Sequence, residues 1–542
     1  MMNQGGDFMS IDIYVNGNVI SLDKDKTYEA FAVKDGKFLA VGSNKDIISL
    51  LPNDDYKVTD LGGNTVVPGF NDAHMHLLNY EFQKNAVQLN NISSIENMIK
   101  VVKSYISKND IPKGTYIISR GWNDNFFKEQ RLPNRYDLDK ISCDHPIIFS
   151  RICGHIGVVN SKAIELLGID RINENPAGGA IDRKNGISTG ILRENALNIA
   201  LSKIPPTSVE DIKTTLCSTF DDLIKCGITS VQTEDLTHCR SLRNLIQAYK
   251  ELEEEGKLPV RITLQLCLNT DELLKEAKEL GLKSKLGGKF LKVGGLKLFQ
   301  DGSLGARTAA MMDNYEDTSN NGISIYSQEE LDSLVAKGFN QGFQIIIHGI
   351  GDRACEMILN SYEKISNDST DNLRPVIVHC QFTNDLLLNR FKDIGVIANV
   401  QPAFIMSDYP IVEKAVGKNR TKCSYAFNSM IQKGIPVAFS SDAPIESFNV
   451  IEGIHGAVNR TDLNNNPKGG FNINEGVTVI DALKAYTTIP SYMSFDEESK
   501  GKIKINYLAD FIILSQDITS VSKSKIKDIK VLETYVNGQK VL

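Results

Sequence analysis

Two histidines separated by one residue follow an apolar run in VVPGFNDAHMHLL, residues 66–78, and the whole chain of 542 residues has only eight histidines. Side chains alternate across a β-strand, so His74 and His76 would point the same way, about 6.5–7 Å apart along the chain. Two imidazoles in this arrangement can bind one metal ion at about 2 Å each. The pair alone is equally compatible with two structural histidines, so its meaning depends on what lies near it.

Polar residues also end other apolar runs of the chain. FQIIIH ends in His348, RPVIVH ends in His379, and PVAFSSD ends in Asp442. Beside a group of neutral imidazoles, Asp442 makes sense as a metal ligand and proton acceptor. The recurrence of such residues at the ends of apolar runs predicts a metal site.

The elements that would position these residues alternate between helix and strand. From about residue 208 onward, seven strand-like runs each follow a helical segment, and the run at 66–76 supplies an eighth strand. This pattern predicts a closed parallel (β/α)8 (TIM) barrel, in which functional groups lie at the C-terminal ends of the strands. A doubly wound open sheet is the alternative, and the lack of a glycine-rich phosphate turn after the first strand disfavours it.

Lys297 lies within one of these runs, GGLKLFQDGS. Leu296 and Leu298 flank it, and strand alternation would turn those two leucines outward and Lys297 into the barrel. A bare ammonium there is costly. A nearby acid, a metal-linked modification or a substrate carboxylate could each compensate it.

The remaining segments predict two attachments to the barrel. Short strands with Asn-Gly and Asp-Gly turns occupy both ends of the chain, which suggests one small β-sandwich built from both termini. Residues 81–204 interrupt the repeat after the first strand and read as an inserted subdomain over one face of the barrel. We therefore divide the chain into residues 1–62 and 501–542 for the sandwich, 63–80 for the first barrel strand, 81–204 for the insertion and 205–500 for the rest of the barrel.

Composition excludes several classes of protein. A net charge of −7 disfavours partners such as nucleic acids or anionic membranes. No apolar run approaches the roughly 18 residues that span a bilayer, and we find no signal peptide. Nine cysteines occur without a CxxC pair, which argues against a disulfide framework and favours a reducing cytoplasm. We expect a small-molecule substrate.

The ordered motifs carry a family resemblance over nearly the whole chain. The sequence resembles the metal-dependent amidohydrolase superfamily, and within it the YtcJ-like branch that includes N-substituted formamide deformylase (amidohydrolase family 3). The matching segments are VVPGFNDAHMH, GGLKLFQDGSLGARTA, IIIHGIGDRA, VIVHC and AFSSDAPIE in the barrel, and RGWNDNFF and RICGHIGVVNSKAIELLGI in the insertion.

This resemblance implies roles for the residues above. His74, His76, His348 and His379 correspond to metal ligands, and Asp442 corresponds to a ligand that is also the general acid and base. Lys297 lies where many superfamily members have a carboxylated lysine that bridges two metals. The implied cofactor is one or two divalent metal ions, with zinc expected, and the family suggests a homodimer.

The implied reaction is hydrolysis of a carbon–nitrogen bond, such as an N-formyl or N-acyl amide, by metal-activated water. A deaminase of the same superfamily and a non-catalytic metal-binding barrel are the alternatives. A serine hydrolase is disfavoured because Asp301 stands where the G-x-S-x-G motif needs its first glycine. The candidate substrate contacts are Trp122, Arg151, His155, Asp301 and Arg307. Each also has a structural alternative: Arg307 could form an ion pair with Asp301, and Trp122 could lie in the core of the insertion.

Overall fold

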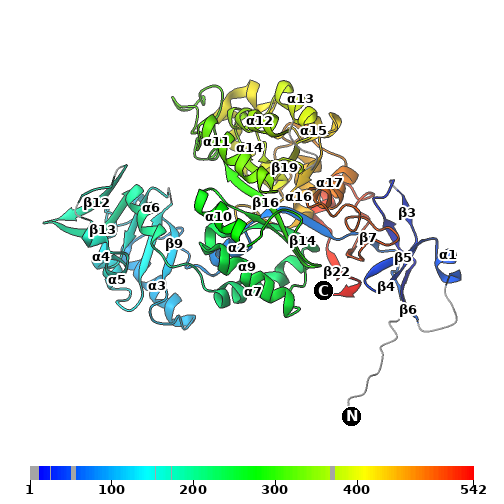
Figure 1. Cartoon of the computed structure of the whole chain (residues 1–542), viewed down its shortest axis with the longest axis horizontal. Helices are drawn as coiled ribbons and strands as arrows, with labels where there is room; N and C mark the ends of the chain where they lie inside the picture. The colour runs from blue at the N-terminus through cyan, green and yellow to red at the C-terminus, as the bar shows by residue number, and fades with distance from the viewer. Residues whose placement is uncertain are drawn as a thin grey trace, which may run out of the picture. The chain divides into compact units, whose positions relative to one another are not determined.

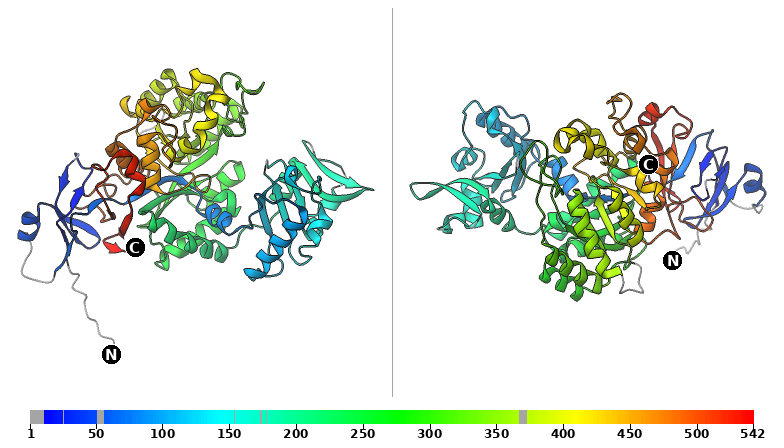
Figure 2. Two further views of the ribbon diagram at one scale, coloured as in Figure 1. Left: turned by 180° about the vertical axis from the view of Figure 1, so that it is seen from behind. Right: turned by 90° about the horizontal axis from the view of Figure 1, so that it is seen from above.

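The computed structural model describes residues 11–24, 26–50, 56–152, 154–172, 174–176, 178–366 and 373–542. The chain divides into two compact units. The first unit combines Met1–Tyr80 with Thr207–Leu542, and the second is Glu81–Pro206. Figure 1 and Figure 2 show the chain from three sides.

An eight-stranded parallel sheet forms the centre of the first unit. It curls into a nearly closed barrel, which confirms the predicted fold class. The strands lie in chain order around the sheet. They are β8 (Phe70–Met75), β14 (Ile228–Glu234), β15 (Arg261–Leu266), β16 (Leu291–Phe299), β17 (Gln344–Gly349), β18 (Val376–His379), β19 (Ile397–Val400) and β20 (Val437–Phe439).

Hydrogen bonds beyond the strand ends join β8 to β20. The Asp442 N–H donates to the His74 carbonyl at 2.9 Å, and the His76 N–H donates to the Ala443 carbonyl at 2.8 Å. The Ser441 N–H donates to the Asp72 carboxylate at 3.1 Å. The seam of the barrel, between β8 and β20, is therefore closed by hydrogen bonds at the C-terminal edge, where the predicted metal ligands lie.

Amphipathic helices follow the strands. In α7 (Val209–Lys225), Ile212, Leu216, Phe220 and Leu223 recur at helical spacing and are buried, and Ser208 caps the first turn. The principal helices after it are α9 (Leu242–Glu254), α10 (Asp271–Glu279), α11 (Gln328–Asn340), α12 (Asp352–Ser366), α13 (Asp385–Ile394), α14 (Pro402–Thr421), α15 (Phe427–Gln432), α16 (Val450–Asn459), α17 (Val479–Ala485) and α18 (Thr488–Met493). Among the described residues, none of the helices is long and apolar enough to span a membrane.

Both ends of the chain meet in two sheets packed on a shared apolar core. Strand β7 (Thr65–Pro68) pairs antiparallel with β21 (Phe511–Leu514), and the blue and red strands lie side by side in Figure 1. Gly69 then leads directly into β8; a Cβ there would meet Thr229 Oγ1 at 2.2 Å, so only glycine fits. The other strands are β1 (Ile11–Val15), β2 (Asn18–Ile20), β3 (Thr27–Tyr28), β4 (Ala30–Lys34), β5 (Lys37–Gly42), β6 (Tyr56–Asp60), β22 (Val531–Val536) and β23 (Gln539–Lys540).

The second unit is a five-stranded sheet with helices on both faces. Alternation along β10 (Ile147–Arg151) explains the two cores, because Ile147 and Phe149 join one apolar cluster while Ile148 joins the other. Its other elements are β9 (Ile117–Trp122), β11 (Ile156–Val159), β12 (Gly179–Lys184), β13 (Ile187–Glu194), α3 (Ile95–Lys108), α4 (Arg135–Asp139), α5 (Ser161–Leu167) and α6 (Asn195–Ser202).

Candidate metal centre

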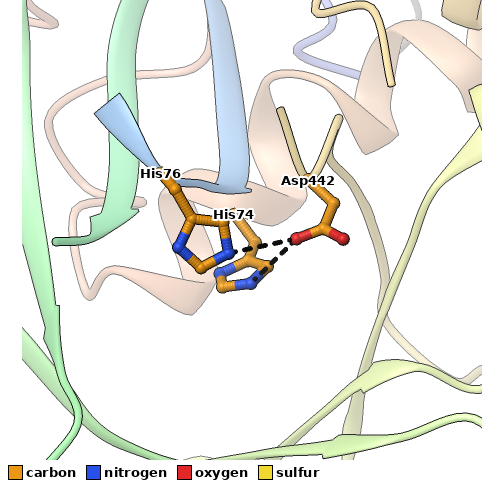
Figure 3. Close-up of side chains that lie close together, drawn as sticks. All are labelled: His74, His76 and Asp442. Carbon is orange, nitrogen blue, oxygen red and sulfur yellow. Dashed lines mark ion pairs between the residues drawn. The ribbon is translucent and has the colours of Figure 1, made fainter. Parts of the chain in front are cut away.

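Three buried side chains converge where β8 and β20 end. Asp442 Oδ1 lies 3.4 Å from His74 Nε2 and 3.3 Å from His76 Nε2, and one donor atom from each residue lies within 4.8 Å of the other two. Figure 3 shows both imidazoles turned toward the same carboxylate oxygen. Two imidazole nitrogens and one carboxylate oxygen are a donor set that zinc and similar divalent cations accept, so these residues fit a metal.

The hydrogen bonds behind these two histidines decide which nitrogen remains available. His74 Nδ1 lies 2.6 Å from Gln265 Oε1, and His76 Nδ1 lies 2.7 Å from the Glu234 carbonyl. Both acceptors are oxygens, so each Nδ1 carries a proton and each Nε2 faces Asp442. The Nε2 of His76 donates to Asp442 in the metal-free site and would present its lone pair to a metal once it loses that proton.

His348 and His379 form a neighbouring pair whose ring centroids are 4.3 Å apart. His379 also lies beside His74, at 6.4 Å between centroids. His348 Nε2 contacts the Gly302 carbonyl at 2.9 Å and Asp301 Oδ1 at 3.2 Å, so its Nδ1 is the free nitrogen. The structure thus brings His74, His76 and Asp442 into one group and places the other two predicted histidines next to it.

Lys297 extends into this region from β16. Its side chain is fully buried, its Nζ has no hydrogen-bond partner among the described residues, and the amine lies 4.4 Å from the centroid of the Phe299 ring. Burial lowers the pKa of Lys297 to about 8, against the opposing charges of Asp442 and Glu234. A buried amine thus lies beside the group of His74 and Asp442, in electrostatic contact with both.

The charges of the centre favour an ionised Asp442. Burial alone would raise the pKa of Asp442, but the hydrogen bond from His76 and the charges of His379, His74 and His76 hold it well below its usual range. Burial lowers the pKa of His76, yet its bonds to Asp442 and Glu234 outweigh this and raise it to about 10. Burial lowers the pKa of His74 and of His379 well below the usual value. The metal-free centre therefore holds an anionic Asp442 carboxylate paired with a protonated His76, beside the imidazoles of His74 and His379.

Sequence reasoning missed several residues of the site. Donor atoms of Glu234, at the end of β14, and His238, in α8 (Leu236–Cys239), lie within 4.8 Å of each other and of a ring nitrogen of His76. Glu234 follows the same strand-end rule as the predicted ligands and could have been found by it. Gln265 carries no charge that would mark it in a sequence.

The predicted substrate contacts of the insertion all lie in the second unit. Trp122 is 1% exposed and donates its indole N–H to the Phe149 carbonyl at 3.2 Å, which places it in the core of that unit. Arg151 pairs with Asp124 at 2.6 Å, and the exposed His155 lies 2.9 Å from Glu194. A role for Arg151 and His155 in substrate binding stays a prediction.

The two predicted contacts after β16 have other partners. Asp301 accepts backbone N–H groups of Ile350, Gly351 and Ala310 at 2.8–3.0 Å, besides its contact with His348. Arg307 pairs with Asp317 at 2.7 Å rather than with Asp301. Asp301 therefore supports His348 and the loop backbone. A role for Asp301 and Arg307 in substrate binding stays a prediction.

The sequence matches the amidohydrolase family over residues 57–542. The chain belongs to this family. The putative amidohydrolase YtcJ of Bacillus subtilis (strain 168) is 31% identical over 520 residues, 96% of each chain. The N-substituted formamide deformylase of Arthrobacter pascens is 26% identical and aligns over 97% of each chain. These relatives confirm the YtcJ-like branch of the amidohydrolase family that the motifs predicted.

A solved structure agrees with this assignment. An uncharacterized metal-dependent hydrolase from Pyrococcus horikoshii OT3 superposes with a TM-score of 0.80 at 28% identity, over 95% of this chain and 99% of that one. Family and fold together support a hydrolase, and the group of His74, His76 and Asp442 supports a divalent metal.

Proposed function

We propose that this amidohydrolase cleaves a carbon–nitrogen bond in a small amide, of the N-formyl or N-acyl amine class. The observation that carries the proposal is the position of Asp442 Oδ1, 3.4 Å and 3.3 Å from the Nε2 atoms of His74 and His76. A buried anionic carboxylate beside metal-ligand nitrogens is suited both to bind a cation and to exchange a proton.

We propose zinc as the metal, held by His74, His76 and Asp442, with His348 and His379 available for a second ion. When bound, such an ion polarises a carbonyl and lowers the pKa of a coordinated water toward neutrality. If Lys297 becomes carboxylated, its cation is replaced by an anionic oxygen ligand that resolves the unpartnered buried amine and favours two ions over one.

The chain's own groups then manage the proton. Asp442 is ionised in the resting site and accepts the proton of the attacking water at a carboxylate oxygen. It returns this proton to the leaving nitrogen, which must depart as a neutral amine. His74 and His76 each keep Nδ1–H bonded to an oxygen behind the site, so neither needs to gain or lose a proton during turnover.

The amide class of substrate rests on similarity. The deformylase of Arthrobacter pascens aligns with this chain along almost its whole length, and it is named for N-substituted formamides. Unlike larger acyl groups, a formyl group demands little space beside the buried imidazoles. These points support N-formyl amines as the first substrates to test.

The decisive experiment measures metal content and hydrolysis together. Protein with zinc restored after chelation is assayed against N-formyl, N-acetyl and longer N-acyl amines, with amino-heterocycles and esters in parallel. Release of amine that disappears with chelator and returns with zinc supports the proposal. Ammonia released only from amino-heterocycles would indicate a deaminase. Full activity without metal, or metal-loaded protein that converts nothing in the panel, would overturn it.

A further inference from the structure

A continuous chain of hydrogen bonds connects His74 and His379 beneath the candidate metal centre. It passes through four buried polar side chains and one backbone carbonyl. Gln265 lies on β15 and Asn399 on β19, while Gln401 and Ser440 directly follow β19 and β20. None of the four belongs to the predicted ligand set.

One half of the chain starts at His74. Its Nδ1 lies 2.6 Å from Gln265 Oε1, and the amide of Gln265 donates through Nε2 to the Ala73 carbonyl at 3.0 Å. The same carbonyl accepts Nδ2–H of Asn399, also at 3.0 Å. The register between β8 and β14 shifts across Ala73 and His74, and the Ala73 carbonyl accepts two side-chain amides.

The other half starts at His379. Its Nδ1 lies 2.8 Å from Gln401 Oε1, and Gln401 Nε2 donates to Ser440 Oγ at 2.9 Å. Ser440 in turn donates its hydroxyl hydrogen to Asn399 Oδ1 at 2.6 Å. Asn399 is thus the junction of the two halves, although it contacts neither histidine.

The direction of every bond follows from the Ala73 carbonyl, because a carbonyl can only accept. Gln265 and Asn399 must both turn their N–H groups toward it, so Gln265 shows its oxygen to His74. Asn399 then shows its oxygen to Ser440, which leaves the hydroxyl lone pairs for Gln401 Nε2. Reversal of the Gln265 amide would set its oxygen against the Ala73 carbonyl oxygen, and reversal of Gln401 would set its oxygen against the lone pairs of Ser440 Oγ, so buried acceptors would face acceptors, which costs free energy.

We propose that this chain of hydrogen bonds holds His74 and His379 as Nδ1–H tautomers, so that both present Nε2 lone pairs to the metal, with Gln265, Ser440, Asn399 and Gln401 as positioning residues. The inference rests on the proposed metal centre. His348 provides the contrast, since its Nε2 bond to the Gly302 carbonyl gives the opposite tautomer. The acceptor behind each histidine therefore determines its tautomer, and neighbouring histidines of one site have different tautomers.

The first test uses metal-free protein and needs no activity. Histidine-selective ¹⁵N NMR identifies the protonated nitrogen of each ring, with assignment by single histidine substitutions. Wild-type protein is expected to show Nδ1–H for His74 and His379, and Nε2–H for His348. Nε2–H at His74 or His379 overturns the proposal even if no variant folds.

The second test asks how the two halves depend on each other. Gln265→Leu is expected to disturb the tautomer of His74 alone. Asn399→Leu should disturb His379 alone, and less than Gln401→Leu does, because Ser440 loses its acceptor while Gln401 Nε2 keeps its 3.4 Å contact with the backbone carbonyl of residue 399 and Gln265 still donates to Ala73. Unchanged spectra in both variants, or identical changes at both histidines, would contradict a directed chain.

The third test measures zinc affinity by competition with a fluorescent chelator. Gln265→Leu and Gln401→Leu are expected to weaken binding about 10- to 100-fold, as for other residues that orient histidine ligands. Gln344→Leu is the matched control, since this buried glutamine of β17 donates to the Arg374 and Met493 carbonyls and no contact with a histidine is seen in the described residues. Equal losses in all three variants, or no loss in the first two, would overturn the proposal. Wild-type protein that binds no zinc would instead refute the proposed function and leave the NMR test intact.

Discussion

Asp442 is bound to His74 through both its backbone and its side chain. Its N–H donates to the His74 carbonyl at 2.9 Å, and its Oδ1 lies 3.4 Å from His74 Nε2. The backbone of Asp442 has a φ of 58°, in the left-handed region that few residues other than glycine, asparagine and aspartate adopt. The carboxylate therefore reaches the centre from a conformation that the seam of the barrel holds in place.

This arrangement predicts that Asp442→Asn folds normally but turns over slowly. Asparagine tolerates the same backbone conformation and keeps the bond to His74, yet its amide cannot accept the proton of water. We expect kcat to fall at least about 100-fold while the melting temperature stays close to that of the wild type. Glu446→Gln, which removes another charge from the same loop, is the control. Near wild-type kcat in Asp442→Asn would refute the proton-transfer role.

Lys297→Met tests whether the buried lysine contributes to a second metal site. Methionine keeps the volume and apolar packing of the side chain but offers no amine for carboxylation. We expect zinc per chain to fall from two ions to one, measured by elemental analysis after gel filtration. The control is Lys292→Met, on the same strand, whose amine pairs with Asp496. Two ions in Lys297→Met would show that this lysine is not a ligand.

Strand patterning accounts for how much of the site could be predicted from sequence. The runs that precede His348 and His379 are continuous apolar segments, as expected of parallel strands buried on both faces, whereas polar residues already stand between the apolar run and His74 or Asp442. Parallel strands bring their C-terminal ends together, so residues hundreds of positions apart could be expected at one place. Physical periodicity was therefore sufficient for the barrel and for the position of its polar strand ends.

The supporting residues could not be predicted in the same way. Gln265 is 191 positions from His74, and an uncharged amide in a strand has no chemical signature. The structural alternative of an Arg307–Asp301 ion pair is also not formed, because Asp301 accepts loop backbone N–H groups and Arg307 pairs with Asp317. Contacts made by irregular segments depend on three-dimensional packing that no local pattern encodes.

Arg261→Met is expected to destabilise the junction between barrel and sandwich. Arg261, on β15, forms a bidentate pair with Asp510 at 2.7 and 2.9 Å, and both side chains are buried. Removal of one partner leaves an uncompensated buried charge, so the free energy of unfolding should fall by about 3–5 kcal/mol in urea titrations. Arg243→Met, at an exposed pair with Glu276, should change it by less than about 1 kcal/mol. Equal effects of both substitutions would contradict this account of the junction.

The raised pKa of Asp72 predicts that its contribution to the free energy of unfolding falls as pH rises. Burial raises the pKa of Asp72 from 3.8 to about 7, although N–H groups of Ser441 and His74 donate to its Oδ1. Its Oδ2 has no hydrogen-bond partner within the part of the chain that the structure describes. Between these two values the folded protein keeps a proton that the unfolded chain releases. The contribution of Asp72 to stability is therefore fully present below about pH 4 and is lost as pH rises through about 7.

Asp72→Asn removes this titration while its amide oxygen still accepts both N–H groups. The difference in unfolding free energy between metal-free Asp72→Asn and wild-type protein should therefore shift in favour of the variant by up to about 4 kcal/mol between pH 4 and pH 7. Urea unfolding at half-unit pH steps measures it. The contributions of other titrating groups are the same in both proteins and cancel in this difference. The amide nitrogen of asparagine changes the difference only by an amount that is independent of pH. A difference that stays constant across this range would mean that Asp72 is ionised in the folded protein throughout.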